Sequence, residues 1–233
     1  MTEAAPTVKR RHAPRTFTIA AVVVAMVVGV LGGWLVFGQA NPDSDSVEAG
    51  FARDMSEHHA QAVDMSLIAL QASDDRNIDV LAYDIATTQS TQIGTMKGWL
   101  AQWDAPLARS GPRMEWMPAE AVPGTGMDGT DAMDAMPAAK PTDPDYLSMP
   151  GMATSAQMEQ LRAATSTDAE ILYLQLMITH HLAGVDMAQT AVDTSTTPEV
   201  TQLAAAMVNG QRSEIDLMTA LLDERGGIPQ EDM

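Results

Sequence analysis

Apolar residues recur at helical spacing in two stretches of the chain, residues 47–72 and 168–192. In both stretches the inward positions follow one another in alternating steps of four and three residues. Such steps place the side chains on a single core-facing stripe of an amphipathic helix. The predicted stripes are Phe51, Met55, His58, Ala62, Met65 and Ala69 in the first helix, and Tyr173, Met177, His180, Gly184, Met187 and Ala191 in the second.

Each of these helices is followed by another predicted helix. One covers about 77–103, and the other begins at Pro198, because Pro suits the first helical position. The second of these helices is expected to stop near Gly226, since Gly is common just beyond a helix end. Capping-box spacing or residue type predicts the N-caps Asp45, Thr167 and Thr197.

The two stripes belong to an internal repeat with an offset of 122 residues. One helical hairpin cannot easily bury its apolar face alone, whereas two hairpins can form a four-helix bundle. The sequence therefore predicts an all-α fold in which the two His-His segments approach each other. The residues that agree at this offset are Met55, His58, His59, Val63, Asp64, Met65, Leu81, Ala82, Gln89, Ile93, Met96 and Leu100, matched by Met177, His180, His181, Val185, Asp186, Met187, Leu203, Ala204, Gln211, Ile215, Met218 and Leu222.

Residues 17–38 contain no charged side chain, and their 22 positions are enough for a helix that crosses a bilayer. The basic residues before them should remain in the cytoplasm under the positive-inside rule. A signal peptide cleaved near Ala40 is the alternative, although this apolar segment is longer than a usual signal core. The predicted organisation is a cytoplasmic basic tail (1–16), a transmembrane anchor (17–38), a linker (39–46), an extracytoplasmic bundle domain (47–227) and a C-terminal tail (228–233).

Charge and composition narrow the function classes. Residues 1–38 carry a formal charge of +3 and the remainder carries −21, so the bundle should repel nucleic acid and attract cations. The chain has 18 Met and no Cys, which leaves the Met thioether as its soft metal ligand. No catalytic constellation is recognisable, so we expect a binding protein rather than an enzyme.

Four histidines follow the basic tail, and all lie in the two His-His pairs. His58 and His180 fall on the core stripes, whereas His59 and His181 lie about 100° around the helix and are ranked as less certain ligands. Thioethers with imidazoles favour Cu(I), or Ag(I) by the same logic, whereas Zn would leave the methionines unexplained. Asp64 or Asp186 could compensate part of the ionic charge. The predicted metal ligands are His58, His180, Met55, Met65, Met177, Met187, His59 and His181.

Other chemistry is less consistent with these residues. A di-iron bundle requires Glu-x-x-His, which this chain lacks. A haem held by His and Met remains an alternative. So does a non-catalytic interaction module that uses a Met-rich surface.

Between the second and third long helices lies a Pro-, Gly- and Met-rich insertion at about 105–154, closed by a short helix over about 155–164. A loop of this length is functional or disordered in most proteins. Exposed methionines in it are predicted to capture soft metal; a partner-binding surface, or folding of the loop onto the bundle, is the alternative. The Met-x2-Met pairs are Met114 and Met117, Met133 and Met136, and Met149 and Met152.

The segments 55–59, 149–154 and 176–188, with Gln211, Glu214 and Met218, resemble the domain-of-unknown-function family 305 over roughly residues 46–225. The resemblance implies a ferritin-like four-helix bundle that is exported or membrane-anchored. It also implies a link to copper, because some members are periplasmic copper-binding proteins tied to copper resistance. The expected function is extracytoplasmic Cu(I) binding for tolerance, buffering or delivery to a protein partner. A copper or haem redox protein is the third hypothesis.

Overall fold

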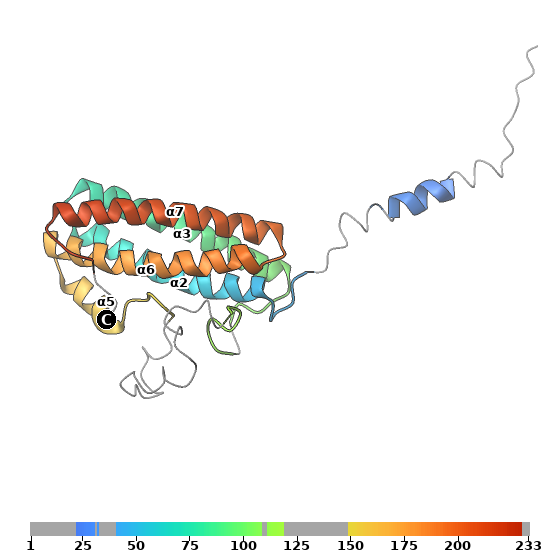
Figure 1. Cartoon of the computed structure of the whole chain (residues 1–233), viewed down its shortest axis with the longest axis horizontal. Coiled ribbons are helices and arrows are strands. Elements are labelled where there is room, and N and C mark those ends of the chain that lie inside the picture. Colours follow the sequence, from blue (N-terminus) through green and yellow to red (C-terminus); the bar gives the residue numbers. More distant parts are fainter. Residues whose placement is uncertain (1–21, 31, 33–40, 109–110, 119–148, 230–233) are drawn as a thin grey trace, which may run out of the picture. The chain divides into compact units, whose positions relative to one another are not determined.

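The computed structural model describes residues 22–30, 32, 41–108, 111–118 and 149–229 (Figure 1). The chain divides into two compact units, Met1–Asn41 and Pro42–Met233. In the first unit, residues 22–30 are helical and their large apolar side chains are exposed. Among the residues described, no helix has the length and apolarity needed to span a bilayer. Most of the predicted anchor, the whole tail before it and part of the linker lie outside the described residues.

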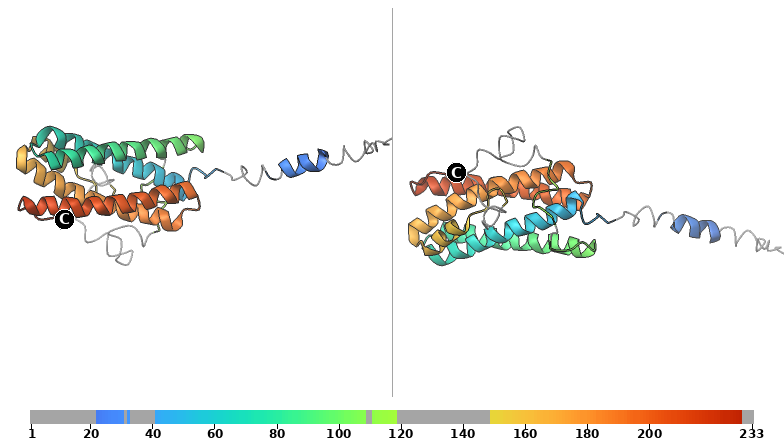
Figure 2. Two further views of the ribbon diagram at one scale, coloured as in Figure 1. Left: turned by 90° about the horizontal axis from the view of Figure 1, so that it is seen from above. Right: turned by 90° about the horizontal axis from the view of Figure 1, so that it is seen from below.

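The second unit is built from helices, and the described residues contain no strand. Figures 1 and 2 show four long helices side by side, with α2 packed on α3 and α6, and α6 packed on α7. The all-helical prediction is therefore confirmed. The helices are α2 (Val47–Ala72), α3 (Arg76–Gln102), the short α5 (Ser155–Ala163), α6 (Ser166–Thr194) and α7 (Pro198–Glu224).

Two of the predicted helix caps are wrong by one or two residues. The cap of α2 is Ser46 rather than Asp45, because the Ser46 side chain accepts the Ala49 N–H and its carbonyl accepts the Gly50 N–H. Helix α6 begins earlier than expected, with Thr165 as N-cap, since the Thr165 carbonyl accepts a hydrogen bond from the main chain of Ala169. The cap of α7 is Thr197, followed by Pro at the first position as predicted.

The core-facing stripes of α2 and α6 are buried along their whole predicted length. Their methionines divide between two apolar clusters. Met55 and Met187 lie in one cluster, and Met65 and Met177 lie in the other. The earlier methionine of α2 shares a cluster with the later one of α6, and the later methionine of α2 shares a cluster with the earlier one of α6. The two helices therefore run antiparallel, with the His-His segments between the clusters.

The described parts of the insertion fold onto the bundle. The buried Asp54 carboxylate accepts hydrogen bonds from the Met114 N–H and the Trp116 Nε1–H. Further along, the Gln61 amide exchanges two hydrogen bonds with the main chain of Ala153. The predicted exposure of the insertion methionines is therefore wrong for Met114, Met117 and Met149, which are buried in the same cluster as Met55 and Met187, while Met152 is partly buried against it. The pair Met133 and Met136 lies outside the described residues.

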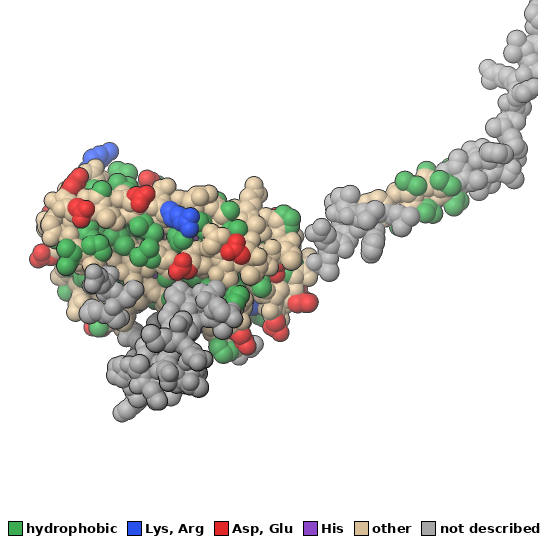
Figure 3. All heavy atoms as spheres, in the orientation of Figure 1, with side chains coloured by type: hydrophobic (Ala, Val, Ile, Leu, Met, Phe, Trp, Pro, Cys, Tyr) green, Lys and Arg blue, Asp and Glu red, His purple; other side chains and the backbone are tan. Residues whose placement is uncertain are grey.

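Acidic side chains are spread over the face of the second unit that Figure 3 presents, and basic ones are few. This distribution agrees with the excess of 31 acidic over 13 basic residues in the chain. Such a surface favours the approach of cations over that of phosphates.

Candidate metal site

All four histidines of the bundle are buried. His58 and His180 are 1% exposed, and His59 and His181 are 0% exposed. His59 and His181, which the helical spacing places about 100° away from the core stripes, are therefore as buried as the stripe histidines. A helix in a bundle contacts two neighbours, so α3 covers one side of α2 and α7 covers the equivalent side of α6.

The imidazoles of His58 and His180 stack on each other at the contact between α2 and α6. Their ring centroids are 3.7 Å apart, with an angle of 29° between the ring planes. Nε2 of His180 lies 3.0 Å from the main-chain oxygen of His58. The His58–His59 and His180–His181 centroids are 6.4 and 6.2 Å apart, so the four rings form one contiguous layer.

Hydrogen bonds fix the tautomers of three rings. Nε2 of His59 lies 2.7 Å from Gln92 Oε1, and Nε2 of His181 lies 2.8 Å from Glu214 Oε2. An amide oxygen, a carboxylate and the carbonyl that faces His180 can only accept, so Nε2 carries the proton in all three rings. In a neutral ring the other nitrogen, Nδ1, then has a free lone pair, which is the form that binds a metal.

The free nitrogens have no hydrogen-bond partner in the part of the chain that the structure describes. Among the described residues, eight buried side-chain nitrogen or oxygen atoms lack a hydrogen bond, and seven of them belong to this layer and two glutamines beside it. Buried polar atoms without partners are rare and call for an explanation, such as an ion that binds there. The seven atoms are His58 Nδ1 and Nε2, His59 Nδ1, His180 Nδ1, His181 Nδ1, Gln89 Oε1 and Gln211 Oε1.

Burial also keeps the imidazoles of His58, His59 and His180 neutral. The pKa of His59 falls to about 3, mainly because burial penalises the charged ring, and the Gln92 hydrogen bond opposes this shift. Burial likewise holds the pKa values of His58 and His180 well below 6.5, and the neighbouring histidines add repulsion. Neutral imidazoles are competent ligands, so no proton has to leave these rings before a metal binds.

Met55, Met65, Met177 and Met187 are all 0% exposed and flank the His layer along both helices. Within the part of the chain that the structure describes, no three His, Asp or Glu side chains form a group that could hold an ion by themselves. The candidate ligands are therefore of two types: the imidazole nitrogens of the layer and the thioether sulfurs of the methionines that flank it. Both donor types are uncharged and suit a soft monovalent ion.

Sequence reasoning ranked none of the glutamines, nor Glu214, as part of the site. Gln92 and Glu214 orient His59 and His181, while Gln89 and Gln211 are 3% and 4% exposed beside the layer. The signal was present in the sequence, because Gln89 and Gln211 are identical at the 122-residue offset and Gln92 and Glu214 occupy one repeat position.

The aspartates expected to compensate the ionic charge face away from the layer. Asp64 is about half exposed, with 52% of its side chain accessible, and it pairs with Arg162 at 2.8 Å. Asp186 is exposed, and partial burial raises the pKa of its carboxyl group while Arg212 opposes that shift. Glu214 is instead the carboxylate that contacts a histidine of the layer.

One end of the insertion covers the His layer. Gly151 has φ of +73°, and a Cβ there would lie 2.5 Å from the Ala183 Cβ and 2.8 Å from the Thr179 carbonyl oxygen. Burial lowers the pKa of His58, and a main-chain hydrogen-bonding group of Pro150 beside the ring opposes part of that shift. The segment 149–153 is thus pressed against α6 beside His180, and only Gly fits its closest approach.

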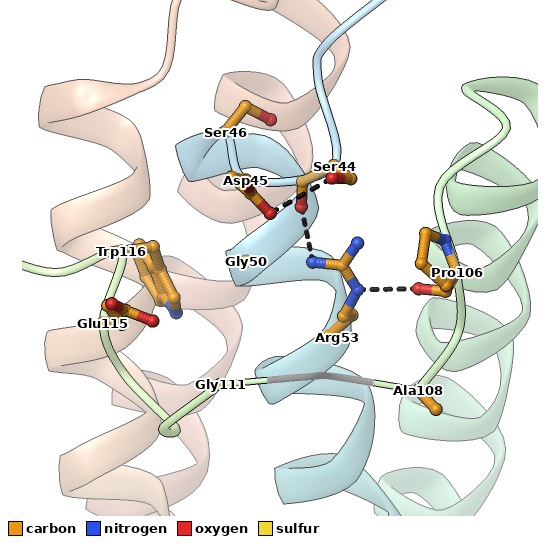
Figure 4. A pocket seen from close by; sticks show the side chains of 10 residues that line it. All are labelled: Ser44, Asp45, Ser46, Gly50, Arg53, Pro106, Ala108, Gly111, Glu115 and Trp116. Carbon is orange, nitrogen blue, oxygen red and sulfur yellow. Dashed lines mark hydrogen bonds between the residues drawn. The ribbon is translucent and has the colours of Figure 1, made fainter.

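A separate pocket of about 370 Å³ opens where the linker, α2 and the insertion meet (Figure 4). Arg53 donates hydrogen bonds from Nη1 to the Ser44 carbonyl and from Nε to the Pro106 carbonyl, each at 2.7 Å. Trp116 and Glu115 line the opposite side. None of the predicted metal ligands lines this pocket, so it is not part of the candidate metal site.

The fold and the His layer define a class: a helical bundle protein that buries two His-His pairs and the methionines that flank them in its core. The chain belongs to the family described as Domain of unknown function (DUF305), whose profile matches residues 48–222. No protein of curated function matches the chain.

Solved structures of the same family support this assignment. A putative secreted DUF305 protein from Streptomyces coelicolor is 43% identical, with a TM-score of 0.67, and the match covers 82% of this chain and 100% of that one. A DUF305 fragment from Deinococcus radiodurans is 30% identical, with a TM-score of 0.59 and coverage of 78% and 99%. CopM in its Cu(I)-bound form shares the fold at 23% identity, with a TM-score of 0.54 and coverage of 78% and 99%.

Proposed function

We propose that this domain binds copper as Cu(I) through its buried His/Met layer, and that it serves copper tolerance, buffering or delivery outside the cytoplasm. One observation carries the proposal: four buried imidazoles each have an Nδ1 atom with no hydrogen-bond partner among the described residues. A histidine that served only structure would use its buried nitrogens in hydrogen bonds. A bound ion would satisfy the free lone pairs without protonating the rings.

The donor set favours a soft monovalent ion. The proposed ligands are His58, His59, His180 and His181 through Nδ1, together with the thioethers of Met55, Met65, Met177 and Met187. These donors are neutral, so Cu(I) or Ag(I) would bring a single positive charge into the core, which costs less than a divalent ion does. Zn²⁺ would favour thiolate or carboxylate ligands. The chain has no Cys, and the Glu214 carboxylate is engaged by Nε2 of His181.

The relatives are consistent with this role. CopM has been described in Cu(I)-, Cu(II)- and Ag-bound forms. At 21–24% identity, those structures share the fold with this chain and leave its ligands to be argued from its own residues. In this chain the two histidine pairs lie in one buried layer, and the four methionines flank it in the two apolar clusters.

We propose further that residues 17–38 anchor the chain in a membrane, with residues 1–16 in the cytoplasm and the bundle outside. The absence of charge over these 22 residues supports the anchor, and the helical, apolar residues 22–30 lie within it. The Streptomyces coelicolor relative, described as a putative secreted protein, supports an extracytoplasmic location. Copper delivered from this site would pass to a protein partner at the same membrane.

The domain is best understood as two copies of one ferritin-like hairpin. Equivalent contacts support this view, because the bonds from His59 to Gln92 and from His181 to Glu214 both join residues 33 apart. Helices α2 and α3 would form one copy and α6 and α7 the other. The insertion would then be an addition between the copies, with its methionines closing one end of the core.

The test is a competition titration of the full-length chain with a chromogenic Cu(I) chelator. His58→Leu/His180→Leu removes two proposed ligands while it preserves apolar volume. We expect its affinity for Cu(I) to fall by more than about 100-fold, since loss of an outer-shell partner alone costs about 10–100-fold. Met158→Leu is the matched control, because Met158 is buried on α5 outside the layer. Equal affinity in the double variant and the wild type would refute the His layer as the copper site, and a Soret band in the purified protein would assign haem instead.

A further inference from the structure

The two histidine pairs have different hydrogen-bond partners at equivalent positions. His59 donates from Nε2 to the amide oxygen of Gln92 at 2.7 Å, and His181 donates from Nε2 to the carboxylate of Glu214 at 2.8 Å. Gln92 and Glu214 lie 122 residues apart, as His59 and His181 do. The geometry is therefore shared by the two halves, whereas the charge is not.

This difference changes the ligand strength of the two rings. A carboxylate that accepts the N–H of an imidazole makes the other ring nitrogen a stronger donor to a metal. A neutral amide oxygen polarises the ring less. Nδ1 of His181 is thus the stronger donor and Nδ1 of His59 the weaker one, and both are buried without a partner among the residues that the structure describes.

The carboxylate also adds a negative charge on one side of the layer. His181 is fully buried and the Glu214 side chain is 25% exposed, so water screens their interaction only in part. Attraction to this charge grows with the charge of the ion, and a divalent ion gains more from it than a monovalent ion does. The side chain of Gln92 beside His59 is uncharged, so it gives a divalent ion no such advantage over a monovalent one.

We propose that Glu214 sets the oxidation-state preference of the two halves: the His180–His181 half is the stronger ligand for Cu(II), and the His58–His59 half, with Gln92, favours Cu(I). This inference rests on the proposed copper function. It makes Glu214 and Gln92 positioning residues, which act on the metal through the imidazoles they orient. One bundle would then offer two chemically distinct places for copper.

The experiment exchanges the two side chains in the full-length chain. Glu214→Gln, Gln92→Glu and the double exchange keep side-chain length and a hydrogen-bond acceptor for Nε2. Affinities for Cu(I) and Cu(II) are measured by chelator competition, and unfolding by circular dichroism verifies that each variant folds. We expect Glu214→Gln to weaken Cu(II) binding by about 10–100-fold and Cu(I) binding less. Each tenfold change in their ratio raises the potential of the bound copper by about 59 mV.

The reciprocal variants distinguish this role from simple loss of a surface charge. Gln92→Glu should strengthen Cu(II) binding, and the double exchange should restore a wild-type ratio of affinities. In the double exchange, the electron paramagnetic resonance spectrum of bound Cu(II) should respond to His59→Gln, whereas in the wild type it should respond to His181→Gln. If Glu214 had only a structural role, the Cu(II) spectrum of the double exchange would still respond to His181→Gln and not to His59→Gln.

Two results are decisive against the inference, and they separate it from the function on which it rests. If the wild type binds copper and Glu214→Gln leaves the Cu(II)/Cu(I) affinity ratio unchanged, the inequivalence is wrong while the copper site stands. If the wild type binds neither ion, the copper function and the inference fail together. A changed ratio in Glu214→Gln with restoration by the double exchange supports both.

Discussion

Nε2 of His180 lies 3.0 Å from the main-chain oxygen of His58, and the two imidazoles stack with centroids 3.7 Å apart. These residues are equivalent in the two halves of the chain, but only one of them has a hydrogen bond across the interface. Neither ring nitrogen of His58 makes a hydrogen bond of good geometry among the described residues, and the main chain of Pro150 is the polar group that approaches the ring. At the centre of the bundle, two equivalent histidines therefore differ in their hydrogen bonding. The imidazole of His58 has fewer hydrogen bonds, so we expect an added ligand to bind there first.

The metal-free protein should lose stability as the pH falls below about 6.5. An unfolded histidine takes up a proton near pH 6.5, whereas His59 in the folded state does so only near pH 3, and His58 and His180 also resist protonation. The unfolded state therefore binds more protons, and each of these histidines should remove about 1.4 kcal/mol of unfolding free energy per pH unit below this range. Above pH 7 these three histidines are neutral in both the folded and the unfolded state, so they should no longer make the free energy of unfolding depend on pH.

Urea unfolding between pH 5 and pH 8, with a chelator present, measures this effect. The variant His58→Leu/His180→Leu should show a clearly smaller slope, because two of the three groups are gone. A slope that is the same in both proteins would mean that other groups, such as surface carboxylates, cause the pH dependence.

The four core methionines should matter more for copper than for folding. Each of Met55, Met65, Met177 and Met187 is fully buried, and Leu has nearly the same volume. Each Met→Leu change should therefore cost less than about 1.5 kcal/mol of stability. The fourfold variant should lose most of its Cu(I) affinity in chelator competition and yet melt cooperatively. Retained affinity would remove the thioethers from the proposed ligand set.

Gly184 should be harder to replace than the exposed helix glycines. A Cβ at Gly184 would lie 2.4 Å from Oε1 of the buried Gln211, which would have to move. We expect Gly184→Ala to destabilise the protein by about 1–3 kcal/mol, as overpacking does in other cores. Gly94 and Gly98 meet nothing within 4 Å, so Gly94→Ala and Gly98→Ala should each stabilise it by about 0.5–1 kcal/mol. Thermal unfolding of the three variants would contradict this account if all of them shifted in one direction.

Asp54 should hold the first part of the insertion on the bundle. Its carboxylate is 1% exposed and accepts hydrogen bonds from the Met114 N–H and the Trp116 Nε1–H. Asp54→Ala should cost about 1–3 kcal/mol, because buried donors lose their acceptor, and it should speed proteolysis within 105–118. Asp64→Ala is the matched control: it removes an ion pair whose side chains are about half exposed, which costs less than about 1 kcal/mol. Equal proteolysis in the two variants would show that Asp54 does not anchor the segment.

The sequence by itself determined the helices and the inward stripes. Helical periodicity depends on local spacing, so it placed Met55, His58 and Met65 on one buried face without knowledge of the partner helix. The 122-residue offset likewise related Met177, His180 and Met187 to them. The bounds of α2, Val47–Ala72, agree with the predicted range, since polar turn residues flank a continuous apolar pattern, although the capping residue was misassigned by one position.

Only the tertiary structure decided which neighbours each stripe meets. One helix has a single periodicity, but in a bundle it contacts two others, so His59 and His181 are as buried as the stripe residues they follow. The same packing gave Gln92 and Glu214 their role and turned Asp64 and Asp186 toward solvent. It also buried Met114, Met117 and Met149, whose loop sequence carries no periodicity that could have predicted a contact with the core. Long-range packing, which no local pattern encodes, thus decided the polar partners of the His layer.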